Sequence, residues 1–157
     1  MPAKFKSFDH LLKPDPRFQS KLVGKFINSV MYAGKKTLAQ RIVYTAIEDV
    51  CKKVKDKDPI DIFTTAINNV KPHVEVRSRR VGGATYQVPV QVPPKRQTSL
   101  AFRWLLASTR SKKGRPMALK LADELMHAYR GEGDAVKKRD DIHKMAESNK
   151  AFAHLAY

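Results

Sequence analysis

The residues with the clearest chemistry are the arginines and lysines around residues 75–97, which read EVRSRRVGGATYQVPVQVPPKRQ. Arginine presents a planar fork of donors that matches a phosphate group, and lysine adds a mobile point charge. The glycine pair lets one backbone approach another closely. Together with basic residues elsewhere, this segment indicates phosphate binding. The predicted contact set is Lys35, Lys36, Arg77, Arg79, Arg80, Lys95, Arg96, Arg110, Lys112, Lys113 and Arg115.

The net charge of the chain is concentrated in two segments. Among 157 residues, 31 Lys and Arg stand against 15 Asp and Glu, a formal net charge of +16. Residues 1–36 hold 8 basic and 2 acidic residues and residues 71–115 hold 11 and 1, whereas the other two segments balance at 5 and 5 and at 7 and 7. Solubility does not require such segregation. The pattern favours a surface that binds a polyanion on an otherwise neutral scaffold.

Patterns typical of catalysis and metal binding are hard to find. The run GKKT at residues 34–37 lacks the earlier glycine of a phosphate-binding loop, because that position is Ser29. The five histidines have no zinc-protease spacing, and one cysteine cannot supply a cysteine-based metal site. Adjacent acidic pairs such as Asp140-Asp141 point to different sides of a helix. We therefore expect no enzyme activity, no metal, no cofactor and no small-molecule substrate.

Three residues have two interpretations each. Cys51 lies in an apolar helical pattern, which favours a reduced thiol in or near the core over a reactive one. Trp104 could stack on a base, but its apolar helical face favours core packing. For Tyr86, near the tip of the basic segment, base stacking and packing against the protein remain equally open. No segment approaches the ~18 apolar residues of a membrane span, so we expect a cytoplasmic protein without a membrane partner.

The periodicity of apolar residues predicts six helices, at about residues 20–34, 36–55, 59–70, 95–110, 116–131 and 134–152. Pro14 and Pro16 predict that residues 1–17 form an extended basic arm. Two alternating segments predict a β-hairpin over residues 73–92. The expected fold is one mainly α domain over residues 1–157, a six-helix domain with a protruding two-stranded antiparallel β-hairpin.

The register of the hairpin depends on its turn. With a two-residue glycine turn, Val76 would face Pro89, and the valines would divide between the two faces of the ribbon. A three-residue loop at residues 82–84 instead pairs Val76 with Val90, so that the valines share one face. We therefore expect the three-residue loop, with an apolar base that docks on the helices and a basic tip.

Four segments occur in an order and spacing that resemble a known family: KPDPRF, KFINSVMYAGKK, NNVKPHVEVRSRRVGGATYQVPVQVPP and AVKKRDDIHKMAESNKAFAH. They resemble the bacterial form of the protein-seven family of the small ribosomal subunit. The resemblance covers nearly the whole chain, and the hairpin segment is its most specific part.

This resemblance implies a six-helix domain with a protruding hairpin that binds the 3′ major domain of 16S ribosomal RNA and starts assembly of the subunit head. It also implies that the hairpin and final helix lie near the exit-site transfer RNA and messenger RNA path, with protein eleven and other head proteins as neighbours. By position, the arm, the Lys35-Lys36 loop, the hairpin arginines and the 112–115 loop contact RNA. The tip facing the exit-site transfer RNA is Val81, Gly82, Gly83, Ala84 and Thr85.

Both ends of the chain depart from the family pattern. The N-terminal MPAKFKSFDHLL carries few arginines, and the chain ends FAHLAY where family members often continue FAHYRW. The RNA contacts of both ends therefore stay open. From the residues alone, the alternative is an architectural DNA-binding protein that inserts a β-arm into the minor groove. It is disfavoured because Pro89 lies mid-strand instead of at the tip, where a wedge would insert.

Overall fold

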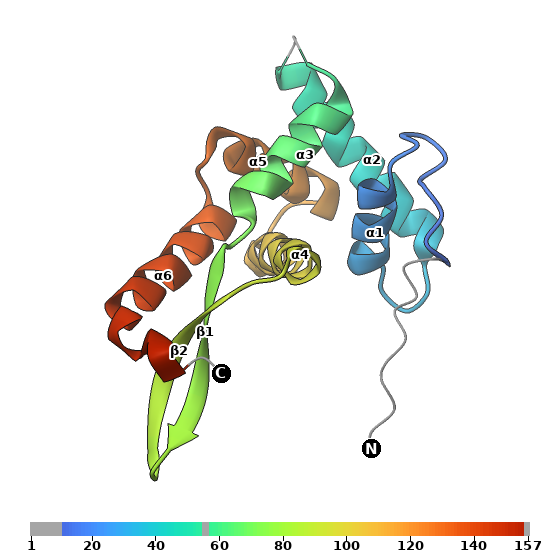
Figure 1. The fold of residues 1–157 in the computed structure, drawn as a ribbon. Helices are drawn as coiled ribbons and strands as arrows, with labels where there is room; N and C mark the ends of the chain where they lie inside the picture. The colour runs from blue at the N-terminus through green and yellow to red at the C-terminus, as the bar shows by residue number, and fades with distance from the viewer. Residues whose placement is uncertain (1–10, 55–56, 156–157) are drawn as a thin grey trace.

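The computed structural model describes residues 11–54 and 57–155, which form six α-helices, a 3-10 helix and two strands (Figure 1). In chain order these are α1 (Lys21–Val30), α2 (Lys36–Lys53), α3 (Pro59–Val70), β1 (Val74–Val81), β2 (Ala84–Gln91), α4 (Pro94–Ser111), α5 (Met117–Arg130), α6 (Asp134–Ser148) and η2 (Lys150–Leu155). The strands form one antiparallel hairpin that protrudes from the helices. The predicted fold class is confirmed. None of these helices has the length and apolar character to cross a membrane.

A cluster of three phenylalanines joins three helices in the core. The ring centroid of Phe26 in α1 lies 5.3 Å from that of Phe63 in α3 and 5.0 Å from that of Phe102 in α4. All three side chains are buried, and each such aromatic pair adds about 0.5–1.5 kcal/mol beyond the burial of its area. The cluster therefore fixes α1 against α4.

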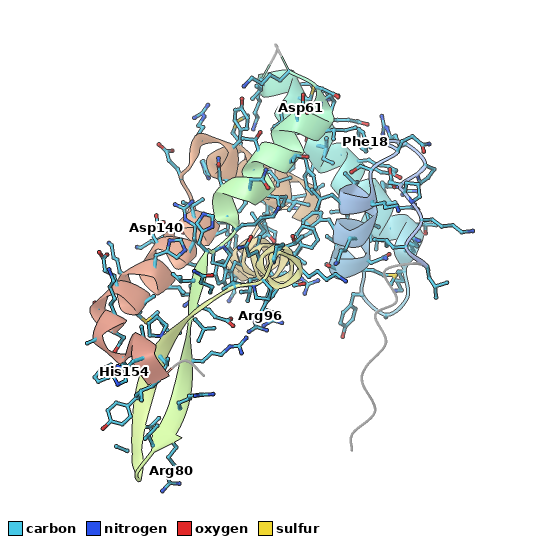
Figure 2. All side chains as sticks on the ribbon, in the orientation of Figure 1. Phe18, Asp61, Arg80, Arg96, Asp140 and His154 are labelled. Atoms are coloured by element: carbon cyan, nitrogen blue, oxygen red, sulfur yellow. The ribbon has the colours of Figure 1, made fainter. Side chains whose placement is uncertain are left out.

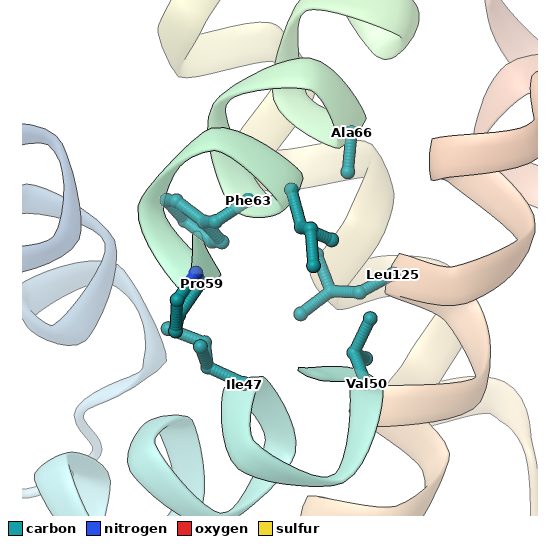
Figure 3. A pocket seen from close by; sticks show the side chains of 7 residues that line it. Ile47, Val50, Pro59, Phe63, Ala66 and Leu125 are labelled. Carbon is teal, nitrogen blue, oxygen red and sulfur yellow. The ribbon is translucent and has the colours of Figure 1, made fainter. Parts of the chain in front are cut away.

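A small apolar pocket lies among α2, α3 and α5 (Figure 3). It is lined by Ile47, Val50, Pro59, Ile62, Phe63, Ala66 and Leu125, and its volume is about 10 Å³. That volume is about the size of a single water, and an apolar wall gives a water no hydrogen-bond partner. The pocket is therefore a packing gap in the core and not a ligand site.

The C-terminal helix ends earlier than the sequence predicts. The expected helix runs toward Phe152, but α6 ends at Ser148 and the chain continues as the 3-10 helix η2. The side chain of Asn149 donates from Nδ2 to the Met145 carbonyl at 2.7 Å. The backbone N–H of Asn149 donates to the same carbonyl at 3.2 Å, so two donors of one residue close the last turn of the helix.

The hairpin closes through a two-residue turn, so the predicted three-residue loop is wrong. Val81 pairs with Ala84, and Gly82 and Gly83 between them have φ angles of +58° and +90°. Both values lie in the left-handed region that glycine adopts readily. A type I′ turn requires this region at both central residues, and its twist matches that of the flanking strands.

The two-residue turn changes which side chains share a face. Val76 lies opposite Pro89, and Glu75 takes the position opposite Val90. Glu75 is only 8% exposed, and Val88 on the same face is fully buried. A carboxylate therefore occupies an inward position where the sequence pattern predicts an aliphatic side chain. Burial of a charge at this position requires a partner of opposite charge.

The chain before α1 is anchored by Asp15, which is 3% exposed. Its Oδ2 accepts two backbone N–H groups of the following turn, each at 3.1 Å, and its Oδ1 accepts the hydroxyl of Tyr44 at 2.6 Å. The described part of the predicted arm, residues 11–17, is thus tied to α2 at this aspartate. Residues 1–10 of that arm lie outside the described residues.

Candidate nucleic-acid interface

Helix α4 carries three arginines at intervals of seven residues: Arg96, Arg103 and Arg110. Seven residues are close to two turns of an α-helix, so the three side chains lie along one face. All three are exposed. We call them the arginine stripe; it extends roughly 21 Å along α4 at 1.5 Å per residue.

A groove of about 440 Å³ lies between α1 and α4, beside the arginine stripe. It is lined by cationic, hydroxyl and apolar side chains: Lys25, Ser29, Ser99, Phe102, Arg103, Leu106, Ala107 and Arg110. Arg110 Nη2 also donates to the Val30 carbonyl at 3.3 Å, which joins the end of α1 to the C-terminal half of α4. Three cations and two hydroxyls around one groove suit the phosphate and sugar groups of a nucleic acid.

Lys35 and Lys36 continue this basic surface beyond the end of α1. Lys35 precedes α2, Lys36 is its first residue, and both are exposed. The N-terminal end of a helix carries a partial positive charge, so it attracts anions even without charged side chains. Arg110 contacts Val30, which lies only five positions before Lys35 in the chain. The Lys35-Lys36 loop therefore lies next to the C-terminal end of the arginine stripe.

At the other end of α4, Glu75 binds two residues of the predicted contact set. Arg96 Nε lies 2.8 and 3.0 Å from the two carboxylate oxygens, and Arg77 Nε lies 2.7 Å from one of them. Burial tends to raise the pKa of Glu75, but the hydrogen bonds and charges of the two guanidinium groups hold that pKa below its ordinary value. The side chains of Arg96 and Arg77 remain 46% and 53% exposed, so both can still meet a phosphate.

The outer half of the hairpin contacts the C-terminal segment. Arg79 Nη1 donates to the Leu155 carbonyl at 2.7 Å, and the ring of Tyr86 lies 5.1 Å from that of Phe152. Of the two interpretations of Tyr86, the structure therefore shows packing against the protein. Arg80 lies near the tip, away from the helices (Figure 2). It is exposed, as are all five residues predicted to form the tip, Val81, Gly82, Gly83, Ala84 and Thr85.

Two of the three basic residues in the loop between α4 and α5 have acidic partners. Lys112 Nζ lies 2.6 Å from Oε2 of Glu124, whose side chain is 0% exposed, and Arg115 Nη1 lies 2.8 Å from a carboxylate of α5. Burial tends to raise the pKa of Glu124, but Lys112 and the backbone N–H of Ala135 hold that pKa below its ordinary value. Lys113 is exposed and has no acidic partner among the described residues.

Two histidines meet where the hairpin joins α6. His143 Nε2 accepts the backbone N–H of His73 at 3.2 Å, and the two ring centroids are 6.0 Å apart. Burial, the charge of Arg139 and that of His73 lower the pKa of His143. Within the described ranges, no group of three or more His, Cys, Asp or Glu side chains is placed to hold a metal ion.

The predicted contact residues lie in two groups, one at each end of α4. Arg77, Lys95 and Arg96 are at its N-terminal end, with Arg79 and Arg80 further out along the hairpin, and Arg110, the Lys35-Lys36 loop and the 112–115 loop are at its C-terminal end. Arg103 and Lys25 connect the groups and are absent from the predicted set. The seven-residue spacing of the stripe is the signal that could have identified Arg103. Lys25 has no comparable signal, because its position depends on how α1 packs on α4.

Comparison with known proteins identifies the family. The family model for ribosomal protein S7p/S5e matches residues 2–150. Small ribosomal subunit protein uS7 of Pelagibacter ubique (strain HTCC1062) is 57% identical over 147 residues, which are 94% of each chain. The uS7 proteins of Rhodopirellula baltica and Thermotoga maritima are each 57% identical, over 144 residues (91% of this chain and 92% of the relative) and 146 residues (93% and 94%). All three relatives are proteins of the small ribosomal subunit. The chain therefore belongs to the ribosomal protein S7p/S5e family.

Proposed function

We propose that this protein binds 16S ribosomal RNA in the small ribosomal subunit, in the cytoplasm, and that its role is structural. The observation that carries the proposal is the arginine stripe with its flanking groove, which links the root of the hairpin to the Lys35-Lys36 loop. Family membership supports the ribosomal setting. The phosphate contacts would come from the arginine stripe and from Arg77, Arg79, Arg80, Lys95 and Lys113. Lys112 and Arg115 would lie close to the RNA, but each is already paired with a carboxylate of the protein.

The physical role would be to neutralise phosphates where several RNA helices converge. RNA helices repel each other through their phosphates, and a cationic surface about 21 Å long lowers that repulsion at several points at once. Double-stranded RNA hides its base edges in a narrow major groove, so shape and phosphate position would set the specificity. We infer that the protein binds the 3′ major domain early and nucleates assembly of the subunit head.

The hairpin would extend beyond this RNA junction. Its tip, Val81, Gly82, Gly83, Ala84 and Thr85, is exposed and narrow, which suits a position near the exit-site transfer RNA and messenger RNA, with protein eleven as a neighbour. A hydroxyl-radical probe attached at Thr85→Cys, in a Cys51→Ser background, should cleave exit-site transfer RNA in assembled subunits. Cleavage confined to remote RNA would contradict this position.

A comparison of two polyanions tests the function itself. Affinity for a transcript of the 3′ major domain should exceed affinity for duplex DNA of equal length by at least tenfold at the same salt concentration. Chemical footprinting should then show protected RNA positions clustered at one multibranched junction. A preference for DNA would support an architectural DNA-binding protein instead, and would overturn the proposal.

A further inference from the structure

A second groove, of about 480 Å³, lies on the other side of α4, between that helix, the hairpin and α6. Its apolar lining includes Val76, Leu100, Trp104, Ile142 and Met145, and Lys138 and Asn149 lie at its α6 side. Trp104 is half-buried: it packs against the core and also lines the groove. Met145 is 47% exposed, so its side chain is open to a ligand. The volume falls within the ~300–1,000 Å³ of small-ligand sites.

The chemistry of this lining suits a flat, partly polar ring. Trp104 supplies an aromatic surface, and aliphatic side chains and a methionine supply the facing wall. Polar atoms remain at the edge: Asn149 donates through Nδ2 to the Met145 carbonyl, which leaves its Oδ1 as an acceptor, and Lys138 is exposed. A nucleobase has two apolar faces and a polar edge, so it matches both parts of the lining.

The charges beside the groove favour a nucleotide over a protein segment. Arg96 lies four residues before Leu100 and Arg103 three residues after it, so both are one helical turn from this lining residue and the arginine stripe borders the groove along α4. The one carboxylate in the lining, Glu75, is already paired with Arg96 and Arg77. Apolar walls beside exposed guanidinium groups provide for both a base and its phosphate.

We propose that an unstacked base of the bound RNA inserts into this groove and stacks on Trp104 while the arginine stripe holds the flanking phosphates. The proposal rests on the proposed RNA-binding function and adds to it a site that reads one extruded nucleotide. Base insertion would fix the register of the RNA on the protein, which phosphate contacts alone leave free to slide.

The intrinsic fluorescence of the protein reports on this groove, because Trp104 is the single tryptophan of the chain. The full-length protein is titrated with the 3′ major domain transcript, and binding is followed by the anisotropy of a label on the RNA. Trp104 emission is recorded in the same samples. A stacked base should quench the emission at least twofold at saturation and protect Trp104 from acrylamide. Binding without either change overturns the groove proposal but leaves the RNA-binding function intact, whereas absence of binding removes both.

Two matched variants test the same site by affinity. Met145→Glu places a negative charge at the edge of the groove and should weaken RNA binding about five- to 150-fold, the range measured for loss of one stacked base. Leu119→Glu alters an apolar side chain of similar exposure, 38%, that does not line the groove and should leave affinity unchanged. Equal affinities for the two variants would overturn the proposal. So would emission of Trp104 that changes only when other small-subunit proteins are added.

Discussion

Glu75 and Arg96 join the hairpin to the helix that carries the arginine stripe. Arg96 donates to both carboxylate oxygens at 2.8 and 3.0 Å, and Arg77 donates to one of them from the same strand as Glu75. An isolated two-stranded hairpin is only marginally stable in water. This carboxylate therefore has a specific role: it holds the base of the hairpin against α4 and sets where the hairpin arginines lie relative to the stripe.

Replacement of Glu75 by Gln should loosen the hairpin without unfolding the helices. The substitution removes the charge from hydrogen bonds that are strengthened by ionisation. We expect amide hydrogen exchange in residues 74–91 to accelerate roughly tenfold, equivalent to about 1.4 kcal/mol, while exchange in α1 to α5 stays unchanged. Glu132→Gln, an exposed acidic position, is the control. Unchanged exchange in the hairpin of the Glu75 variant would show that the pair does not hold the hairpin.

Adjacent Lys112 and Lys113 should respond differently to the same substitution. Lys112→Met leaves the fully buried carboxylate of Glu124 without its cation, whereas Lys113 has no acidic partner among the described residues. Breaking a buried pair costs ~3–5 kcal/mol. Because Lys112 is 35% exposed and water can replace part of its charge, we expect about 2 kcal/mol. Urea unfolding at pH 7 measures the difference, and Lys113→Met should lower RNA affinity and not stability.

The hydroxyl of Tyr44 should be hard to ionise. Its burial, followed by its hydrogen bond to Asp15 and the charge of that carboxylate, raises its pKa to about 12. Tyr44→Phe removes the donor and leaves the buried Asp15 without it, so the free energy of unfolding should fall by about 1–3 kcal/mol. Tyr32→Phe, at a position 82% exposed, should change it little. Equal stability of the two variants would remove the proposed anchor of the N-terminal segment.

Acidification should destabilise the joint between the hairpin and α6 through His143. Its pKa is lowered in the folded protein, so folding favours the neutral ring, which accepts the His73 N–H. The resulting contribution to the free energy of unfolding is fully present above about pH 6.5, the pKa of histidine in the unfolded chain. It is lost as the pH falls below that value toward the pKa of His143 in the folded protein. The charged groups facing His143 are His73, Arg139 and Asp140.

His143→Gln keeps a neutral side chain at every pH and should reduce the loss of Tm between pH 7.5 and 5.5. His127→Gln, an exposed histidine of α5, should retain the full wild-type loss. The contribution of His143 would be disproved if its variant lost as much Tm as the wild type over that range.

Local patterns predicted the helices and the segregation of charge, because each depends on neighbours within one or two turns of the chain. The hairpin register could not be predicted in the same way. Five valines in alternation favoured one apolar face, but the inward position went to Glu75, whose neutralising Arg96 lies 21 residues later in the sequence. The two-residue turn forms because both of its residues, Gly82 and Gly83, adopt a positive φ.

The basic residue types of the contact set could be predicted from the sequence. Their arrangement in space could be predicted only in part. The sequence predicts Lys112 and Arg115 as unpaired cations, but their acidic partners lie in the next helix, α5. Lys25 is placed by the packing of α1 on α4 around Phe26 and Phe102, which no local pattern reveals. Trp104 was predicted as a core residue, and its second surface in a groove depends on where the hairpin and α6 meet.

The most direct test of the central claim is the salt dependence of RNA binding by the wild type and by Arg103→Ala. For the 3′ major domain transcript, the logarithm of the association constant should fall steeply with the logarithm of salt concentration. Arg103→Ala should reduce the magnitude of that slope by about one, the contribution of one phosphate contact, with unchanged helical content. A flat salt response of the wild type, or an identical slope for Arg103→Ala, would contradict RNA binding through the arginine stripe.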